Sequence, residues 1–196
     1  MSIRTPFLIL FAAISAFAHP HIFIDATANL IFDDNGLEGV LNTWKFDLIY
    51  SQAMIAAVDK DQNGIFDAAE TAEFKKQIVD PAKQFSGFNY LGDGTIFFVP
   101  KGTKDLKASV KNGKLVIQFL NQFDIPVKSN DYTMLLLAVT DPTNYIQITI
   151  DMEKCEVKAP KSIDVEYFVD SLKGITLFKN FSANVKGLYV RYRKIQ

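Results

Sequence analysis

The chain has 196 residues, with 21 basic and 22 acidic side chains and a formal net charge of −1 at pH 7. A near-neutral chain lacks the basic surface that nucleic acids require, so no nucleic-acid partner is expected. The single cysteine, Cys155, excludes an internal disulfide. Seventeen phenylalanines among few glycines and prolines are typical of a packed globular domain.

Residues 1–18 have the pattern of a secretory signal peptide. Arg4 supplies a positive charge, residues 6–14 are apolar, and Ala16-Phe17-Ala18 is a small-x-small cleavage box. Cleavage after Ala18 predicts a periplasmic protein with a single mature domain, residues 19–196. The alternatives are a membrane anchor or a buried N-terminal helix, but the apolar run is short for a membrane span.

The mature chain begins with a predicted hairpin. Ile22–Phe32 and Leu37–Phe46 are rich in β-branched and aromatic residues, and the turn signal Asp33-Asp34-Asn35-Gly36 separates them. The hydrophobic period then changes, and Asp47–Val58 predicts a helix. A second helical stretch follows at about Ala68–Phe85, with a kink or an end at Pro81, because proline lacks the amide hydrogen of a helix.

The rest of the chain predicts strands. They are expected at Thr95–Val99, Leu106–Val110, Lys114–Leu120, Tyr132–Thr140, Tyr145–Met152, Ser162–Phe168 and Ala183–Arg193. The predicted fold class is therefore α+β: an antiparallel, sandwich-like β domain with an inserted helix–EF-hand loop–helix unit at about residues 47–88.

The loop between the two predicted helices, residues 59–70, matches D-x-[DN]-x-[DN]-G-x5-E at every specified position. This spacing directs oxygen atoms to one Ca²⁺ ion, and Gly64 permits the sharp turn. Ile65 is expected to offer its backbone carbonyl and to pack its side chain inward. The predicted calcium ligands are Asp59, Asp61, Asn63, Ile65, Asp67 and Glu70.

A lone calcium loop of this kind in an exported protein is expected to be a structural clip with weak affinity, roughly 10⁻⁴ to 10⁻³ M. The alternative interpretation is a solvated acidic loop that binds no ion. Whether the loop is structural or regulatory stays open at this point.

The two histidines of the chain, His19 and His21, follow directly after the predicted cleavage site. His19 would then offer a free α-amine and an imidazole to Ni²⁺, Co²⁺, Cu²⁺ or Zn²⁺, and His21 a second imidazole. Pro20 has no amide hydrogen, so four-nitrogen square-planar chelation by this peptide alone is blocked. Asp25 falls on the same side of a strand as His21 and is a candidate either for a further ligand or for an acceptor of an imidazole N–H. Alternatively, the histidines simply begin a strand.

Two histidines at one end of the chain leave no Ser/His/Asp arrangement, so we predict no enzyme. A histidine-brace redox enzyme would need another histidine from elsewhere in the fold. A metallohydrolase would need carboxylates gathered around His19 and His21.

Four segments together resemble a bacterial family of unknown function whose members are described as periplasmic components of an ABC-type transport system. They are Ala18–Asp25, Trp44-Lys45-Phe46-Asp47, the acidic loop Asp59–Glu70, and Asp141–Tyr145. The resemblance reaches to about residue 158. It implies a link to nickel or cobalt permeases and supports His19 and His21 as ligands. One departure is Asn42, where some relatives are expected to carry a histidine near the tryptophan.

Two functional hypotheses result. The first is a periplasmic accessory protein that captures a divalent transition metal, nickel or cobalt, at its mature N-terminus. It passes the metal to an inner-membrane permease or ABC-type transporter, and Ca²⁺ stiffens its helical insertion. The second is a calcium-stabilised interaction or assembly module in which the histidines have no metal role. An extra residue before His19 distinguishes them, since it abolishes transition-metal binding only under the first hypothesis.

Overall fold

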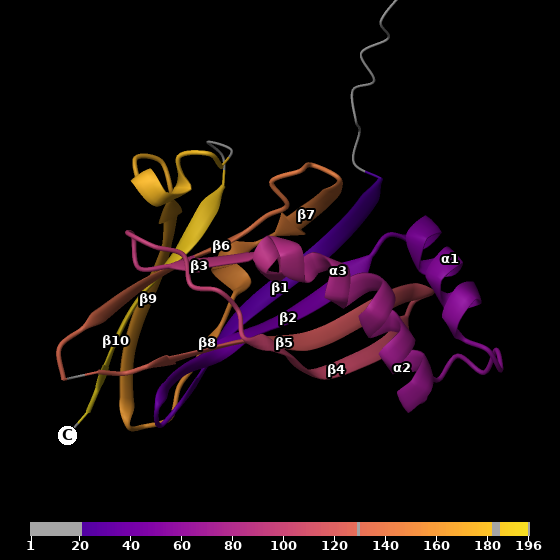
Figure 1. The fold of residues 1–196 in the computed structure, drawn as a ribbon, viewed down its shortest axis with the longest axis horizontal. Coiled ribbons are helices and arrows are strands. Elements are labelled where there is room, and N and C mark those ends of the chain that lie inside the picture. The colour runs from indigo at the N-terminus through magenta and orange to yellow at the C-terminus, as the bar shows by residue number, and fades with distance from the viewer. Residues whose placement is uncertain (1–20, 129, 182–184, 196) are drawn as a thin grey trace, which may run out of the picture.

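The structure is a computed structural model that describes residues 21–128, 130–181 and 185–195. Its strands form two sheets, and the helices that follow β2 lie together at one side of the molecule (Figure 1). The predicted signal peptide, residues 1–18, and His19 lie outside the described residues. Two sheets in a sandwich-like arrangement with a helical insertion confirm the predicted α+β class.

The first sheet has the strand order β4-β5-β2-β1-β7, and β8 also pairs with β1. Its strands are β1 (Ile22–Asp33), β2 (Gly36–Phe46), β4 (Gly102–Lys111), β5 (Lys114–Pro126), β7 (Ile146–Ile150) and β8 (Val157–Lys158). The predicted hairpins are confirmed as antiparallel pairs, whereas β7 and β8 run parallel to β1. Parallel neighbours need long crossover connections, which local sequence patterns do not reveal.

The second sheet has the strand order β3-β6-β10-β9, and all its neighbours are antiparallel. Its strands are β3 (Asn89–Gly92), β6 (Thr133–Val139), β9 (Ile163–Ser171) and β10 (Lys186–Lys194). The strand predicted at Tyr132–Thr140 is confirmed as β6, which lies inside the sheet and buries every residue from Leu135 to Val139. Strand β6 is covered on both faces. Leu135, Leu137 and Val139 pack in one hydrophobic cluster, and Leu136 and Ala138 pack on the other face in a second cluster with Phe178.

The main core includes side chains from both sheets. Leu30 of the first sheet and Leu137 and Leu188 of the second are fully buried members of one cluster. Cys155 belongs to the same cluster, and burial raises the pKa of its thiol. A buried, protonated thiol is a weak nucleophile and a weak metal ligand, so we assign Cys155 a packing role.

The helical insertion lies between β2 and β3. It consists of α1 (Leu48–Val58), α2 (Ala68–Phe74), a π-helical turn (Lys75–Val79), the short α3 (Asp80–Ala82) and a 3₁₀ segment (Lys83–Phe88). Asp47 caps α1, because its Oδ1 accepts a hydrogen bond from Tyr50 N at 3.0 Å. The irregularity predicted around Pro81 appears as the π-helical turn before it and the 3₁₀ segment after it.

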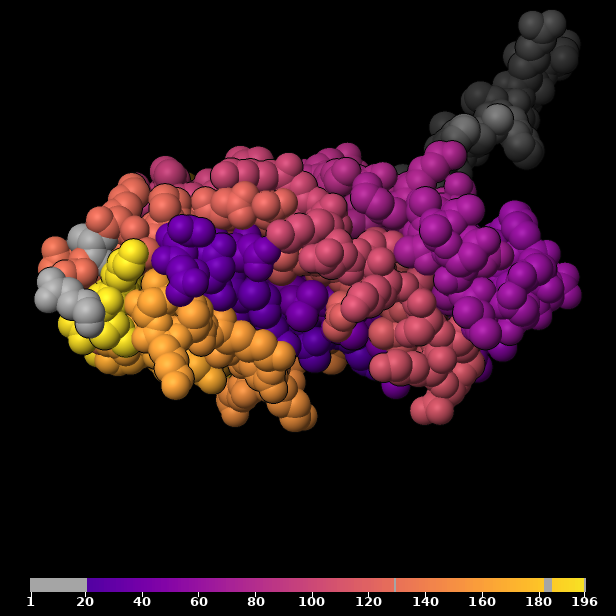
Figure 2. All heavy atoms as spheres, turned by 90° about the horizontal axis from the view of Figure 1, so that it is seen from below, coloured from indigo at the N-terminus to yellow at the C-terminus, as the bar shows by residue number. Residues whose placement is uncertain are grey.

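The predicted strand at Thr95–Val99 is wrong, since this segment forms only an isolated bridge between Gly92 and Phe97. Phe97 and Phe98 of this segment are instead used in side-chain packing, while Ile96 and Val99 are exposed. The ring of Phe97 lies 5.1 Å from that of Phe178 and 5.7 Å from that of Tyr90. The molecule is elongated in Figure 2, with the helical insertion (purple) at one end and the last strand (yellow) at the other.

Candidate cation site

The acidic loop joins two helix ends whose caps involve its first and last acidic residues. At the end of α1, Asp59 N donates to Ile55 O at 2.8 Å. At the start of α2, Asp67 Oδ1 accepts from Glu70 N at 2.8 Å, and Glu70 Oε2 accepts from Asp67 N at 3.1 Å. This reciprocal capping box fixes the second end of the loop before any ion is considered.

Three carboxylates of the loop converge. One oxygen each from Asp59, Asp61 and Glu70 lies within 4.8 Å of the others. Two oxygens that bind one Ca²⁺ at 2.3–2.6 Å are at most about 5 Å apart, so this spacing fits a shared ion. Asp59 and Glu70 are only 6% and 8% exposed. Both accept hydrogen bonds from backbone N–H groups, but two carboxylates so close and so buried also repel each other, and a cation between them would offset that repulsion.

The loop backbone folds around Asp59. Its Oδ1 accepts from Asn63 N at 3.2 Å and its Oδ2 from Gly64 N at 3.0 Å. Gly64 has φ +74°, and Gln62 also has a left-handed backbone, with φ +58°. Glycine adopts this conformation without steric cost, so its place in the motif has a structural reason.

The five predicted calcium ligands that offer a side-chain oxygen divide into two groups. Asp59, Asp61 and Glu70 form the convergent cluster. Asn63 and Asp67 lie in the same loop but accept local hydrogen bonds, from Ile65 N at 2.6 Å and from Glu70 N. A carboxylate or amide oxygen has more than one lone pair, so these bonds leave both side chains able to bind an ion.

The predicted inward packing of the Ile65 side chain is wrong. Ile65 is 74% exposed, and its neighbour Phe66 packs inward, with its ring 4.7 Å from that of Phe74 in α2. Successive side chains of an extended segment point to opposite sides, so only one of two adjacent apolar residues reaches the core. The role predicted for the Ile65 backbone carbonyl does not depend on the side chain.

The described part of the N-terminal site lies at the open end of β1. His21 N donates to Tyr145 O at 3.0 Å, and the two rings are 5.2 Å apart. His21, Phe23 and Asp25 are all exposed on one face of the strand. Four residues of strand separate His21 from Asp25 by about 13 Å, too far for one ion to be bound by both without distortion. No described residue completes a metal cluster with either side chain.

Asn42 does not lie near the N-terminal site. Its partner on β1 is Ala28, seven positions beyond His21, or roughly 23 Å along a strand. Asn42 is completely buried and exchanges two hydrogen bonds with Asn89, at 2.8 and 2.9 Å. Its departure from the expected histidine therefore changes the interior of the protein and not the surroundings of His21.

A buried asparagine cluster is the main polar feature that the sequence analysis missed. Asn121 Nδ2 donates to Asn89 Oδ1 at 3.1 Å and to Ser86 O at 2.8 Å. Together with Asn42, these side chains connect β2 and β5 of the first sheet with β3 of the second. The nearest signal in the sequence is an asparagine within an otherwise apolar stretch of strand, which does not identify its partners.

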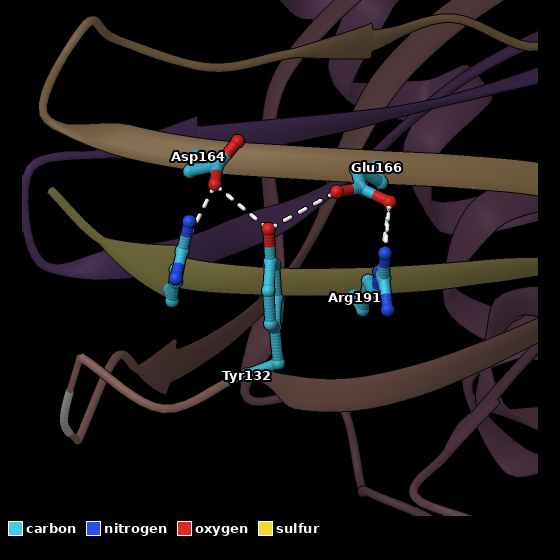
Figure 3. A network of polar contacts seen from close by, with 5 residues as sticks. Tyr132, Asp164, Glu166 and Arg191 are labelled. Carbon is cyan, nitrogen blue, oxygen red and sulfur yellow. Dashed lines mark hydrogen bonds and ion pairs between the residues drawn. The ribbon is translucent and has the colours of Figure 1, made fainter.

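The outer face of the second sheet has an exposed charged network (Figure 3). Tyr132 OH donates to Asp164 at 2.8 Å and to Glu166 at 3.1 Å, while Arg191 pairs with Glu166. The hydrogen bond from Tyr132 lowers the pKa of Asp164, and that from Arg191 lowers the pKa of Glu166. Every charge has an opposite partner on a neighbouring strand, so we assign the network to strand pairing and not to chemistry.

The fold and the loop define the class: a two-sheet α+β protein with an acidic-loop helical insertion. The chain belongs to the family described as protein of unknown function (DUF1007), which matches residues 5–169. The match includes His19, His21 and the whole acidic loop. No curated protein matches the chain. None of the helices in the described ranges is long and apolar enough to cross a membrane.

Proposed function

We propose that the protein is an exported, non-enzymatic calcium-binding module. The convergence of Asp59, Asp61 and Glu70 within 4.8 Å is the observation that supports this proposal most directly. Ca²⁺ prefers carboxylate and carbonyl oxygens, and the loop offers both in the order that an EF-hand uses. Without an ion, the three negatively charged carboxylates repel one another, and a bound divalent cation removes that repulsion.

The proposed role of the ion is to stabilise the helical insertion. Helix α1 contains no charged residue and completely buries only Ser51 and Val58. Ser51 Oγ attaches it to the first sheet by accepting from Leu115 N at 2.9 Å. An ion bound between Asp59 at the end of α1 and Glu70 in α2 would join the two helices directly, beside the shared packing of Val58 and Phe74.

Calcium should therefore raise the midpoint of thermal unfolding. With Ca²⁺ at about 100 times its dissociation constant, the expected gain is near 2.7 kcal/mol, or roughly 5–10 °C for a chain of this size. Calorimetric titration of Ca²⁺ into the mature protein should give one site per chain. Glu70→Gln removes one of the three converging carboxylates and should abolish both effects.

The matched control is Glu73→Gln, a change of the same chemistry in the same helix. Glu73 contacts Gln77 and Lys76 and is not part of the convergent cluster. It should leave calcium binding unchanged. Absence of calcium binding in the unmodified protein would contradict the proposal, as would equal losses in the two variants.

A second candidate function is capture of Ni²⁺ or Co²⁺ at the mature N-terminus for delivery to an inner-membrane permease or ABC-type transporter. The exposed position of His21 at the end of β1 favours it, because the imidazole is open to a metal that also binds His19. Cu²⁺ and Zn²⁺ suit the same nitrogen ligands. Under this proposal the periplasmic protein carries two cations with separate roles.

This second candidate predicts stoichiometric nickel binding that requires a free histidine at position 19. One glycine added before His19, with cleavage confirmed by mass spectrometry, should weaken binding by at least about ten-fold, because it removes the amine–imidazole chelate. His21→Ala should weaken it as well. Nickel binding that survives both changes, or no binding of nickel, cobalt, copper or zinc, would reject the delivery role and leave the calcium module.

A further inference from the structure

A cavity of about 400 Å³ lies between the helical insertion and the first sheet. Its walls come from β1 and β2 on one side, from Tyr50 of α1 and residues 77–88 of the insertion on another, and from residues 141–146, which end in the first residue of β7. Cavities of about 300–1,000 Å³ that are mostly apolar are the usual size for small-molecule sites. The acidic loop does not line it, so this cavity is separate from the proposed calcium site.

Aromatic side chains form much of the wall. Phe46 and Tyr50 are stacked with ring centroids 5.0 Å apart, and Phe85 and Phe88 are nearly parallel at 5.9 Å. Trp44 also lines the cavity, with its ring 5.8 Å from that of Phe88. Large, rigid rings of this kind provide much apolar contact area for little loss of conformational entropy.

The cavity offers no free charge to a ligand. No lysine, arginine or histidine is among its lining residues, and Asp141 is the single carboxylate. Asp141 is 5% exposed and accepts hydrogen bonds from Thr143 N and Ile146 N, both at 2.8 Å, and from Thr143 Oγ1 at 2.7 Å. Its charge is already satisfied, and an ionic ligand would lose its hydration without gaining a counter-charge.

Hydrogen-bond donors in the wall that lack a partner among the described residues include the hydroxyl of Tyr50 and the buried indole N–H of Trp44. The Tyr50 hydroxyl donates to no described residue, and burial, followed by the charges of Tyr145 and Asp47, raises the pKa of this phenol. Tyr50 therefore stays a neutral donor at physiological pH. A hydroxyl beside apolar walls suits a ligand with one hydrogen-bond acceptor on an apolar body.

We propose that this cavity is a binding site for an uncharged, ring-containing apolar small molecule, held by the aromatic wall and by one hydrogen bond from Tyr50. The proposal goes beyond cation binding and does not depend on it. It gives the helical insertion a second role, since the insertion supplies one wall of the site.

Trp44 makes the proposal directly measurable, because it is the single tryptophan of the chain and lines the cavity. The probe is N-phenylnaphthylamine, an uncharged two-part aromatic molecule that quenches tryptophan by energy transfer. Titration into the calcium-saturated mature protein should quench Trp44 and saturate at one probe per chain. Its sulfonated analogue, anilinonaphthalene sulfonate, should bind at least about ten-fold more weakly, because the cavity has no cation for the sulfonate.

Two variants place bulk into the cavity. Ala82→Leu adds it to the helical wall, where Ala82 is 4% exposed, and Ile22→Phe adds it to the strand wall. Each should weaken binding of the neutral probe by at least about ten-fold. Ile22 is only partly buried, so its variant decides the question if Ala82→Leu fails to fold. The control is Ile49→Ser, beside Tyr50 on α1 but 83% exposed, which should bind the probe normally.

Three results would overturn the proposal. One is unchanged probe binding in a folded Ile22→Phe protein. Another is loss of binding in Ile49→Ser, which would place the probe on the exposed face of α1. The third is equal affinity for the neutral and the sulfonated probe, which would show adsorption to apolar surface without the selectivity that this wall predicts.

Discussion

Asn89→Ala is expected to lower the free energy of unfolding by about 2–4 kcal/mol. Asn89 is completely buried, and its side chain joins Asn42 of β2 to Asn121 of β5. The alanine variant leaves the amide oxygen of Asn42 without its donor and removes an acceptor from Asn121, while a small void remains. Chemical denaturation at equilibrium, with calcium saturating, measures the loss.

Two further variants make this prediction specific. Asn180 is exposed, so Asn180→Ala should change stability by no more than about 0.5 kcal/mol. Combining Asn42→Ala with Asn89→Ala should cost less than the sum of the two single changes, because each single change already disrupts the same pair of hydrogen bonds. A loss below about 1 kcal/mol in Asn89→Ala, or additive single effects, would mean that the cluster contributes little.

The asparagine cluster also illustrates which parts of the fold a single sequence can predict. The hairpin β1–β2, helix α1 and the central strand β6 are encoded by local patterns of a few consecutive residues, and the structure confirms them. Asn42 and Asn89 are 47 positions apart and belong to different sheets. Each looks like an ordinary polar residue in a strand until the two sheets are placed together.

The same distinction applies to the two candidate binding sites. All predicted calcium ligands lie within one twelve-residue loop, so their spacing alone is enough to predict them. The residues that line the cavity are spread along the chain, from position 22 to position 146. They come together only when β7 pairs in parallel with β1. From the sequence alone, the aromatic residues of the cavity cannot be distinguished from ordinary core residues. Trp44 is indeed 1% exposed, but it also forms part of a cavity wall.

Ile65 and the segment Thr95–Val99 show a third limit, which is competition between apolar neighbours. The motif predicts that Ile65 packs inward, but in the structure its neighbour Phe66 does so, with its ring against that of Phe74. Likewise, the Thr95–Val99 segment has the composition of a strand. Asp93 makes a turn there by accepting from Thr95 N and Ile96 N, and Phe97 is used for packing instead of strand pairing.

The second large effect is expected from Gly36→Ala, at the turn of the first hairpin. Gly36 has φ +142°, a conformation that other residues rarely adopt. A β-carbon there would lie 2.2 Å from Ile125 O and 2.6 Å from Val127 N. Both are backbone atoms at or just beyond the end of β5, the strand that pairs with β2. Backbone strain and the forced shift together should lower the free energy of unfolding by roughly 2–6 kcal/mol.

The matched control is Gly102→Ala at the start of β4, where an added β-carbon meets no atom within 4 Å. This change should be neutral within about 0.5 kcal/mol or slightly stabilising, because alanine restricts the unfolded chain. A loss below about 1 kcal/mol in Gly36→Ala would show that the turn adjusts without cost.

Hydrogen exchange adds a local test of the same prediction. Val127 N donates to Asn35 O at 2.7 Å, across the point where the Gly36 side chain would intrude. Exchange of the Val127 amide should therefore accelerate in Gly36→Ala more than exchange of amides in the second sheet. Uniform acceleration throughout the protein would instead indicate global destabilisation without a local cause. The sequence Asp33-Asp34-Asn35-Gly36 predicts the turn itself, but the need for glycine arises from β5, which approaches from more than eighty residues away.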